Sequence, residues 1–523
     1  MKSMPGVAEL LLEVGWKLLP EDVRQKLTNR LLLAEARAAI TIPKTEAVTL
    51  TSSANRGQFY TEVLSEGNAR AGKELPRASL ILTCRNEEKS IGTFLDSIAR
   101  QTQLPNEVVI YDGGSTDQTV PLIKKWHDSQ KTRLFDLRLI EGTPSSIAAG
   151  RNRAAEAARY EVLLLTDAGT MLDKDWAKHL LEPLATDPTL DAVMGWYRPI
   201  VELPLQAALA HFLVPSLDTI DAATFLPSAR SLALRRSSLL AVGGYPEHLS
   251  RAGEDSLFDY YLKTVVKRVA FAPEAICYWR MPRDIGALFR TIAGYARGDA
   301  EGGVIAWRYY LTLLSHALKL GIEGFALLLT LMLALVAGSA LLLILPLALS
   351  VLFARRLWQV YLSYQPFHGA DTPAERLWRL VALSIMCSAQ VYGFISGYRA
   401  RPQVEQRRIG ATTKGHLVLL LPEPLHYDPT EKHCARFQQL LTERWYVTAL
   451  YASQPTHTAP IFEHPQSECY RRSEFRLDAW QEKHHTFLSN PQRSFAYLDL
   501  CNDGLSRELS QALEKLGATV LAG

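Results

Sequence analysis

The sequence predicts an α/β protein in which a mostly parallel sheet is followed by apolar helices and then by a second, smaller α/β module. Three observations predict this fold class. Short strand-like runs alternate with helical stretches from about residue 76 to about residue 280. Long uncharged segments follow, and the alternation of strands and helices resumes at residue 414. We therefore divide the chain into an N-terminal region (1–75), a first α/β domain (76–305), an apolar helical region (306–405) and a C-terminal module (414–523).

The strands of the first domain are short apolar runs that end in polar loops. They are expected at 78–84, 107–112, 136–140 and 161–167, with helices at 89–101, 120–127 and 147–159 between them. Parallel strands joined by helices bring their carboxyl ends to one edge of a sheet, where ligands bind. Glu87, Asp112 and Asp167 lie at or after the ends of three of these strands. We therefore expect these three carboxylates around one crevice.

The first 40 or so residues of the N-terminal region carry leucines at helical spacing. Two interpretations stay open, an amphipathic segment on a membrane surface and a helix that packs on its own domain. Glu9 and Glu13 interrupt the leucines, so this region does not have the continuous apolar core of a secretory signal. We therefore expect the bulk of the protein in the cytosol.

The apolar helical region predicts membrane crossings. Residues 324–354 include no charged residue. One helix of that length would measure about 45 Å, more than the roughly 30 Å of a bilayer core, so a tilted crossing or a hairpin is expected. Residues 380–398 are also uncharged and have the length of one crossing. The arginines that follow favour a cytosolic C-terminal module and hence two crossings rather than three. A buried helix of a soluble domain is the alternative for either segment.

The C-terminal module again alternates strands with helices. Strands are expected at 415–422, 446–451, 495–500 and 518–521, and helices at 432–445 and 506–516. This order predicts a small Rossmann-like module without a glycine fingerprint for phosphate. We do not expect this module to be catalytic.

Composition and charge exclude several classes of protein. Of the 523 residues 48% are hydrophobic and 21% are charged, which excludes a disordered or collagen-like chain. The formal net charge of +3, without a dense basic stripe, argues against a nucleic-acid partner. The six cysteines show no zinc-ligand spacing and are interpreted as thiols of a reducing compartment.

Two loops at strand ends have the residue types that hold a nucleoside. The segment 83–88, Thr-Cys-Arg-Asn-Glu-Glu, closes the first strand, where backbone and side chains could bind a nucleobase. Asp112 closes the second strand within Tyr-Asp-Gly-Gly-Ser-Thr-Asp, and the two glycines allow a ligand close to the backbone. Alone, this second motif could be only a turn that caps a helix.

Two further residues are candidates for binding phosphate. Arg151, in Gly-Arg-Asn at the start of a helix, could meet a phosphate directly, although an exposed surface arginine is equally common. Asp167 ends the run Leu-Leu-Leu-Thr-Asp, where a hard cation that bridges two phosphates would be held. The alternative for Asp167 is a helix cap.

An acidic pair, Glu254 and Asp255, follows Gly253. One carboxylate could orient an acceptor and the other could abstract its proton. Alone, such a pair is weak evidence, because most acidic pairs are solvated helix starts.

Taken in order, these motifs resemble the family-2 glycosyltransferases of the GT-A fold over about residues 76–305. The ordered series is much more specific than any one member; it reads TCRNEE, YDGGSTD, GRN, LLLTDAGT, VGGYPE and GEDSLFDYYL. The resemblance implies that the base and ribose of a nucleotide-sugar donor are held by Thr83, Arg85, Glu87 and Asp112. It implies that Asp167-Ala-Gly169 is the metal motif and that Asp255 is the general base.

The sequence departs from the family pattern at two glycines. Gly113 stands where the family often has a second aspartate, and Gly169 replaces the second carboxylate of the metal motif. The resemblance therefore implies that Mg²⁺ or Mn²⁺ is held by Asp167 alone or through water. The Gln-x-x-Arg-Trp motif of processive polysaccharide synthases is missing. Arg297 lies in a basic, glycine-containing segment and could neutralise the diphosphate, or it could meet lipid headgroups instead.

The resemblance implies a membrane-anchored, inverting glycosyltransferase that faces the cytosol at the inner membrane. A nucleoside-diphosphate donor would give its sugar to a hydroxyl of a lipid-linked or saccharide acceptor, in envelope or exopolysaccharide synthesis. Two alternatives stay open. One is a polyprenyl-phosphate sugar synthase, whose anionic acceptor needs no base, and the other is a non-catalytic protein that binds nucleotide sugars.

Overall fold

The computed structural model covers the chain with gaps. It describes residues 74–130, 134–214, 217, 228–250, 252–266, 268–303, fourteen positions between 325 and 351, 372–410, 415–452, 461–489, 493–501 and 504–521. The first 40 residues, with their two open interpretations, and most of the uncharged segment 324–354 lie outside the described residues.

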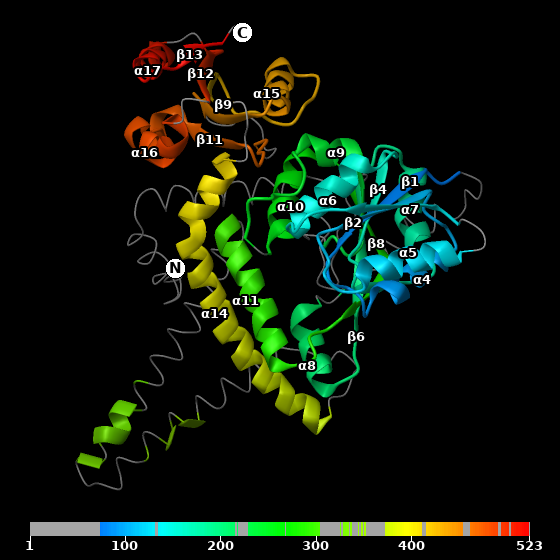
Figure 1. The fold of residues 1–523 in the computed structure, drawn as a ribbon. Coiled ribbons are helices and arrows are strands. Elements are labelled where there is room, and N and C mark those ends of the chain that lie inside the picture. The colour runs from blue at the N-terminus through cyan, green and yellow to red at the C-terminus, as the bar shows by residue number, and fades with distance from the viewer. Residues whose placement is uncertain are drawn as a thin grey trace, which may run out of the picture.

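The first domain is built on an eight-stranded sheet with the order β3-β2-β1-β4-β7-β6-β8-β5 (Figure 1). Its strands are β1 (Ala78–Cys84), β2 (Glu107–Asp112), β3 (Asp136–Glu141), β4 (Val162–Leu165), β5 (Thr170–Leu172), β6 (Ala192–Ile200), β7 (Leu232–Arg235) and β8 (Val269–Arg280). Strands β3, β2, β1 and β4 pair in parallel, whereas β7 is antiparallel to both of its neighbours. The predicted α/β class with a mostly parallel sheet is confirmed for this domain.

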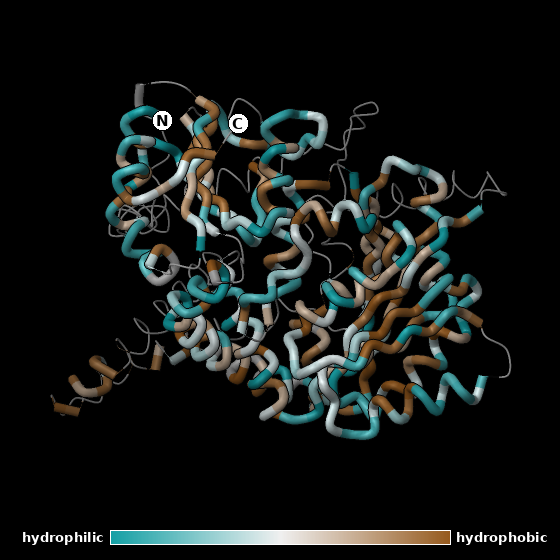
Figure 2. The backbone as a smooth tube through the Cα atoms, turned by 45° about the horizontal axis from the view of Figure 1, so that its top comes forward, coloured by the Kyte–Doolittle hydropathy of each residue, from teal (hydrophilic) through white to brown (hydrophobic). Residues whose placement is uncertain are grey.

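The central strands hold the domain together because they are apolar on both faces. Figure 2 colours the backbone by hydropathy and shows hydrophobic strands, in brown, in this domain. In β1, Leu80 and Leu82 point into one hydrophobic cluster and Ile81, between them, points into another. This alternation follows from the two-residue period of a strand. Helices therefore cover both faces, as expected for a parallel sheet.

The two faces receive different helices. One face is covered by α4 (Ile91–Ala99), α5 (Thr119–Ser129) and α7 (Trp176–Thr186), whose apolar side chains join the cluster of Leu80. The other is covered by α6 (Ile147–Ala157), α9 (Arg236–Ala241) and α10 (Glu254–Val265). The motif Gly-Arg-Asn lies near the start of α6, and the motif Gly-Glu-Asp lies at the start of α10. Both motifs are therefore on the same face of the sheet.

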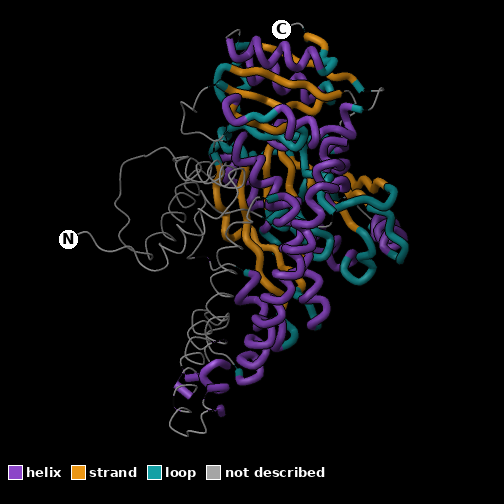
Figure 3. Tube along the Cα trace, turned by 90° about the vertical axis from the view of Figure 1, so that its left-hand side faces the viewer, coloured by secondary structure: helices purple, strands orange, loops and turns teal. Residues whose placement is uncertain are grey.

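Two long helices pack side by side next to the eight-stranded sheet (Figures 1 and 3). Helix α11 (Ile285–Gly302) packs along α14 (Pro373–Gly410), and α8 (Pro204–Leu213) contacts α14 as well. Glycines on α14 allow the close approach. A Cβ at Gly393 would lie 2.2 Å from the Ala293 carbonyl oxygen, and one at Gly397 would lie 2.3 Å from that of Arg297.

The predicted membrane crossing at 380–398 lies within α14. In the part of the chain that the structure describes, no helix combines the length and the mean hydropathy of a bilayer crossing. This prediction is therefore not supported at 380–398.

The C-terminal module contains a separate five-stranded sheet in which every pair is parallel, with the order β11-β10-β9-β12-β13 (Figure 3). Its elements are β9 (Gly415–Leu421), α15 (Lys432–Thr442), β10 (Trp445–Tyr451), β11 (Ser467–Arg471), α16 (Leu477–Leu488), β12 (Ser494–Asp499), α17 (Gly504–Lys515) and β13 (Thr519–Val520). Strand β11 and helix α16 were not predicted from the sequence. The Rossmann-like assignment of the module stays a prediction.

The module packs directly on the first domain. One hydrophobic cluster includes Phe258 of α10 together with Leu417 and Phe437 of the module. The His464 ring lies against the Gly243 turn, where a Cβ would come within 2.1 Å of its Nε2 atom. Arg408, near the end of α14, donates to the Ser467 carbonyl at 3.1 Å. The described parts of the two units therefore share a core.

Candidate active site

The turn after β2 fixes the carboxylate of Asp112. The backbone N–H groups of Gly114 and Ser115 donate to its Oδ2 atom at 3.0 and 2.9 Å, and the Ser115 hydroxyl donates to Oδ1 at 2.5 Å. Gly114 adopts φ of +77°, and a Cβ there would approach Pro144 to within 2.9 Å. Glycine is therefore required at 114, and Asp112 is held at the carboxyl end of β2 by its own turn.

The loop after β1 brings Glu87 beside Gly169. Both carboxylate oxygens of Glu87 lie 3.8 Å from the point where a side chain at 169 would begin. Burial raises the pKa of Glu87, and the nearby Asp167 raises it further against the opposing hydrogen bond from Ser90. The space beside Gly169 is therefore bordered by a carboxylate from the loop after β1.

The other two predicted donor-binding residues of this loop lie differently. Thr83 donates its hydroxyl to the Tyr111 carbonyl at 3.1 Å, and it sits against Gly150, where a Cβ would meet the Thr83 Oγ1 atom at 2.1 Å. Thr83 therefore joins β1, β2 and α6. Arg85 is exposed at the rim of the loop.

Arg151 is the residue at which the predicted carboxylates meet. Its Nη2 atom donates to Asp167 Oδ1 at 2.8 Å, and its Nη1 atom donates to Asp255 Oδ1 at 2.5 Å and to Glu254 Oε1 at 3.2 Å. Its guanidinium also lies 5.0 Å from the centre of the Tyr245 ring. The Arg151 side chain is only 4% exposed. Arg151 was predicted to bind phosphate, but its contacts are those of a residue that positions three carboxylates.

Charges and burial set the protonation of this group. Burial alone would raise the pKa of Asp167, but Arg151 and Arg230 hold it below its ordinary value. Burial and the neighbouring Asp255 raise the pKa of Glu254 to about 7, despite the opposing effect of Arg151. The site therefore carries a permanent anion at Asp167 and a carboxyl at Glu254 that titrates near neutral pH.

The two members of the acidic pair differ in access to solvent. The side chain of Asp255 is 29% exposed, whereas that of Glu254 is 11% exposed. Both lie in the first turn of α10, which begins after Gly253 at φ of +88°. Gly253 packs on the backbone of Gly298 in α11. Asp255 is therefore the more accessible of the two, and its role as general base stays a prediction.

Arg230 belongs to the site but was missed from the sequence. Its Nε atom lies 3.6 Å from Asp167 Oδ2, whereas Arg151 binds the other oxygen of this carboxylate, Oδ1. It precedes β7 in a segment, Ser-Ala-Arg-Ser, that carries no recognised chemistry. Only the pairing of β7 with β4 brings this segment next to the end of β4.

Arg297 is engaged elsewhere. Its Nε atom donates to Glu301 Oε1 at 2.8 Å, one turn further along α11. Glu301 in turn accepts from the backbone N–H of Ser250 at 2.8 Å. The described contacts of Arg297 thus stabilise the segment before α10, and they do not bring its guanidinium to Asp167.

The residues around Asp167 do not fit a divalent cation well. Its two oxygens face two guanidinium groups, and Gly169 supplies no carboxylate. Divalent Mg²⁺ needs several oxygen ligands. Among the described residues, the group of three potential metal ligands that comes within 4.8 Å lies not here but in the C-terminal module. Direct metal ligation by Asp167 stays a prediction that this arrangement disfavours.

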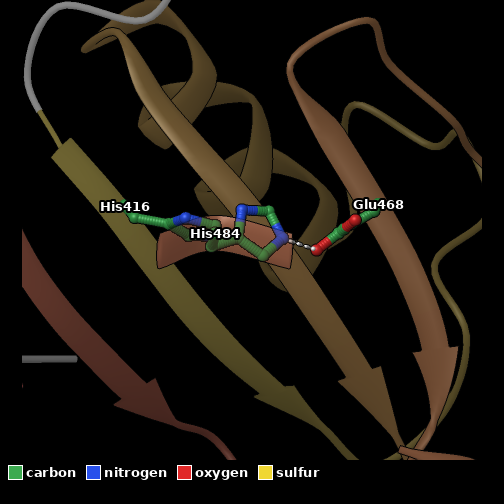
Figure 4. A group of neighbouring side chains, drawn as sticks. All are labelled: His416, Glu468 and His484. Atoms are coloured by element: carbon green, nitrogen blue, oxygen red, sulfur yellow. Dashed lines mark hydrogen bonds and ion pairs between the residues drawn. The ribbon is translucent and has the colours of Figure 1, made fainter. Parts of the chain in front are cut away.

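The group in the module consists of His416 on β9, Glu468 on β11 and His484 on α16 (Figure 4). Glu468 accepts hydrogen bonds from His484 Nε2 and Thr448 Oγ1 at 2.8 Å each and from Trp480 Nε1 at 3.1 Å, and it pairs with the Lys483 ammonium. A cation of the protein therefore already neutralises Glu468. Lys483 also pairs with Glu405 of α14 at 3.0 Å, so this network links the module to the long helix.

Comparison with known proteins shows what part of the first domain is similar to. Residues 79–222 match the family model described as glycosyl transferase family 2. The match covers the strand-end loops of Glu87, Asp112 and Asp167 and includes Arg151. Over these residues the chain is similar to glycosyl transferase family 2.

The curated relatives are polysaccharide synthases. A poly-beta-1,6-N-acetyl-D-glucosamine synthase of Staphylococcus epidermidis is 24% identical over 267 residues, which cover 47% of this chain and 60% of that protein. The synthase of the same name from Staphylococcus aureus strain COL is 24% identical over 235 residues, covering 44% of this chain and 56% of that protein. The chain thus aligns with little more than half the length of these relatives.

Two solved structures are similar to the chain at low identity. The mannosyltransferase PcManGT from Pyrobaculum calidifontis, in complex with GDP-Man and Mn²⁺, is 18% identical with a TM-score of 0.43, covering 71% of this chain and 98% of that one. Residues 1–349 of S. aureus TarS, in complex with UDP-GlcNAc, are 19% identical with a TM-score of 0.32, covering 45% of this chain and 72% of that one.

Proposed function

We propose that this protein is an inverting glycosyltransferase that moves a sugar from a nucleoside-diphosphate donor to a hydroxyl of a membrane-associated acceptor. The observation that carries the proposal is the meeting of Asp167, Glu254 and Asp255 on the buried Arg151. Asp112 ends a strand two places away from β4 in the same sheet, at the same edge. Carboxylates separated by more than a hundred residues are thus gathered at the edge where parallel sheets bind ligands.

The proposed reaction is a single displacement. The loop 83–88 and Asp112 bind the base and ribose of the donor. Asp255 accepts the proton of the acceptor hydroxyl. At the same time the oxygen of this hydroxyl attacks the anomeric carbon from the face opposite the diphosphate. Arg151 keeps Asp255 in place, which supports catalysis because a misplaced base loses much of its effect. The anomeric configuration inverts because one bond forms as the other breaks.

The donor proposed for the first tests is UDP-GlcNAc. The named relatives are synthases of poly-N-acetylglucosamine, and a structurally similar protein was solved with UDP-GlcNAc. These names support a role in envelope or exopolysaccharide synthesis. GDP-mannose is the second donor to test, because PcManGT was solved with it.

The acceptor is proposed to lie at the inner membrane, with the active site on the cytosolic side. Support comes from the described positions between 325 and 351, where every large apolar side chain is exposed. The most exposed of these are Val336 at 81%, Leu335 at 70% and Phe325 at 69%. A concentration of exposed large apolar side chains in one segment is typical of a membrane or protein contact.

A donor screen tests the proposal. The full-length protein is heated with each nucleotide sugar, with and without Mn²⁺, and its unfolding temperature is recorded. We expect one donor to raise the unfolding temperature and to yield a product in a transfer assay with lipid extracts. Stabilisation by a donor without transfer to any acceptor would favour the non-catalytic alternative. The absence of stabilisation by every donor would contradict the proposal.

A further inference from the structure

Arg230 lies in an aromatic cage next to Asp167. Its guanidinium carbon is 4.2 Å from the centre of the Trp279 ring and 5.6 Å from that of the Tyr197 ring. The Arg230 side chain is 16% exposed. The rings come from β8 and β6, so the cage is part of the sheet and fixes the plane of the guanidinium. A preorganised cation therefore stands at the end of β4.

Arg230 has unused hydrogen-bond donors. A guanidinium carries five N–H groups. Its Nη1 atom donates to Ser228 Oγ at 2.8 Å, and its Nη2 atom donates to the Tyr295 hydroxyl at 3.3 Å. The buried Nε atom makes no hydrogen bond within the described part of the chain, although Asp167 lies 3.6 Å away. This Nε atom faces the Asp167 carboxylate, whereas Nη1 and Nη2 each carry a second N–H that has no partner among the described residues and is left for a ligand.

Arg151 differs from Arg230 in this respect. Its two terminal nitrogens already bind three carboxylates, and its side chain is only 4% exposed. An incoming phosphate would have to displace these carboxylates to reach it. Of the two described cations that pair with Asp167, Arg230 is therefore the one that can bind a further anion without breaking the site.

We propose that Arg230 binds the diphosphate of the donor and that this contact takes the place of a divalent ion on Asp167. The inference rests on the proposed function. As the bond between the anomeric carbon and the diphosphate oxygen breaks, its electron pair leaves with the diphosphate, and the planar guanidinium meets the new charge. The acceptor oxygen forms the new bond, and its proton passes to Asp255. Asp167 anchors Arg230 and Arg151 instead of a metal.

Equilibrium binding separates this inference from the proposed function. Binding of UDP and of uridine to the full-length protein is measured in excess EDTA and again in excess MnCl₂, with GDP and guanosine as a parallel series. Variants are Arg230→Met, Arg230→Lys and, as matched control, Arg153→Met. Arg153 lies on α6 with a 52% exposed side chain that pairs with Glu156. Uridine binding shows that the pocket of each variant is folded.

We expect the wild-type protein to bind UDP more tightly than uridine in EDTA, with little further effect of Mn²⁺. Arg230→Met should weaken UDP binding about 10- to 100-fold and leave uridine binding unchanged, as expected for loss of charged hydrogen bonds. The UDP affinity of Arg230→Lys should lie between that of the wild type and that of Arg230→Met, because an ammonium keeps the charge but not the planar, multiple-donor geometry of a guanidinium. Arg153→Met should bind both as the wild type does.

Two results would overturn the inference and leave the proposed function standing. The first is UDP binding that equals uridine binding in EDTA and gains its advantage only with Mn²⁺. The second is Arg230→Met that binds UDP as tightly as the wild type. If no nucleotide or nucleoside binds in either buffer, the proposed function fails together with the inference.

Discussion

At the scale of single residues, the site depends on one buried arginine with three carboxylate partners. The sequence allowed Asp167, Glu254 and Asp255 to be predicted one by one, because each stands in a motif at a strand end or helix start. It could not predict that Arg151 joins them, since Asp255 is 104 residues away along the chain. Arg230 was missed altogether because its position depends on strand pairing and on the rings beneath it.

Glu254 makes stability depend on pH. Its pKa is raised from an ordinary value near 4.5 to about 7, so the folded state holds the proton more tightly than the unfolded state. The stabilisation is complete below pH about 4.5 and is lost as pH rises through about 7, an effect on the order of 3 kcal/mol. Glu254→Gln has no carboxyl to ionise at this position, so it should not show this loss of stability as the pH rises. We expect the unfolding temperature of the wild type to fall relative to that of Glu254→Gln between pH 5 and 8.

The control for this prediction is Glu156→Gln, which changes an exposed carboxylate on α6. Its pH profile should match the wild type. If the profile of Glu254→Gln also matches the wild type, the buried protonation equilibrium assigned to Glu254 is wrong.

At the scale of elements, runs of buried aliphatic residues were the predictable part. Strands β1 and β2 lie where the sequence predicts them because they are apolar and bounded by polar loops. Strands β6 and β8 were not assigned individually. Gly195 and Pro199 interrupt β6, and β8 contains Pro273 and Glu274. Strand β11 was missed because its buried side chains include Glu468, whose burial depends on donors from other elements.

The crossing of α11 with the start of α10 is the element contact that supports the acidic pair. A Cβ at Gly298 would lie 1.8 Å from the Ala252 carbonyl oxygen, so Gly298→Ala must displace the backbone just before Glu254 and Asp255. We expect transfer to fall by at least about tenfold, because small displacements of catalytic groups are costly. Initial transfer rates measure the effect.

Gly294→Ala on the same helix is the matched control. Nothing lies within 4 Å of a Cβ there, so the substitution should keep full activity and increase helix stability. Equal activity of Gly298→Ala and Gly294→Ala would show that this contact does not hold the acidic pair in place.

At the scale of the whole molecule, the proposed account joins a donor site to a membrane-held acceptor. The exposed apolar side chains between 325 and 351 are proposed to contact the bilayer. We expect the full-length protein to float with phospholipid vesicles in a density gradient. Leu335→Asp combined with Val336→Asp should reduce the floating fraction, because each aspartate costs about 2.5 to 3.5 kcal/mol inside a bilayer.

Leu240→Asp is the control for flotation, since Leu240 is 54% exposed on α9 of the first domain. This variant should float as the wild type does. A wild-type protein that stays at the bottom of the gradient would contradict the membrane proposal without affecting the donor site.

The central claim is that Asp255 is the base of a transferase site, and turnover compared with donor binding tests it most directly. Asp255→Asn is assayed for sugar transfer and for donor affinity beside Asp128→Asn, which changes an exposed residue on α5. The account predicts that Asp255→Asn binds the donor with near wild-type affinity and loses transfer, while Asp128→Asn keeps both. Undiminished transfer by Asp255→Asn would contradict the account and favour an anionic lipid-phosphate acceptor that needs no base.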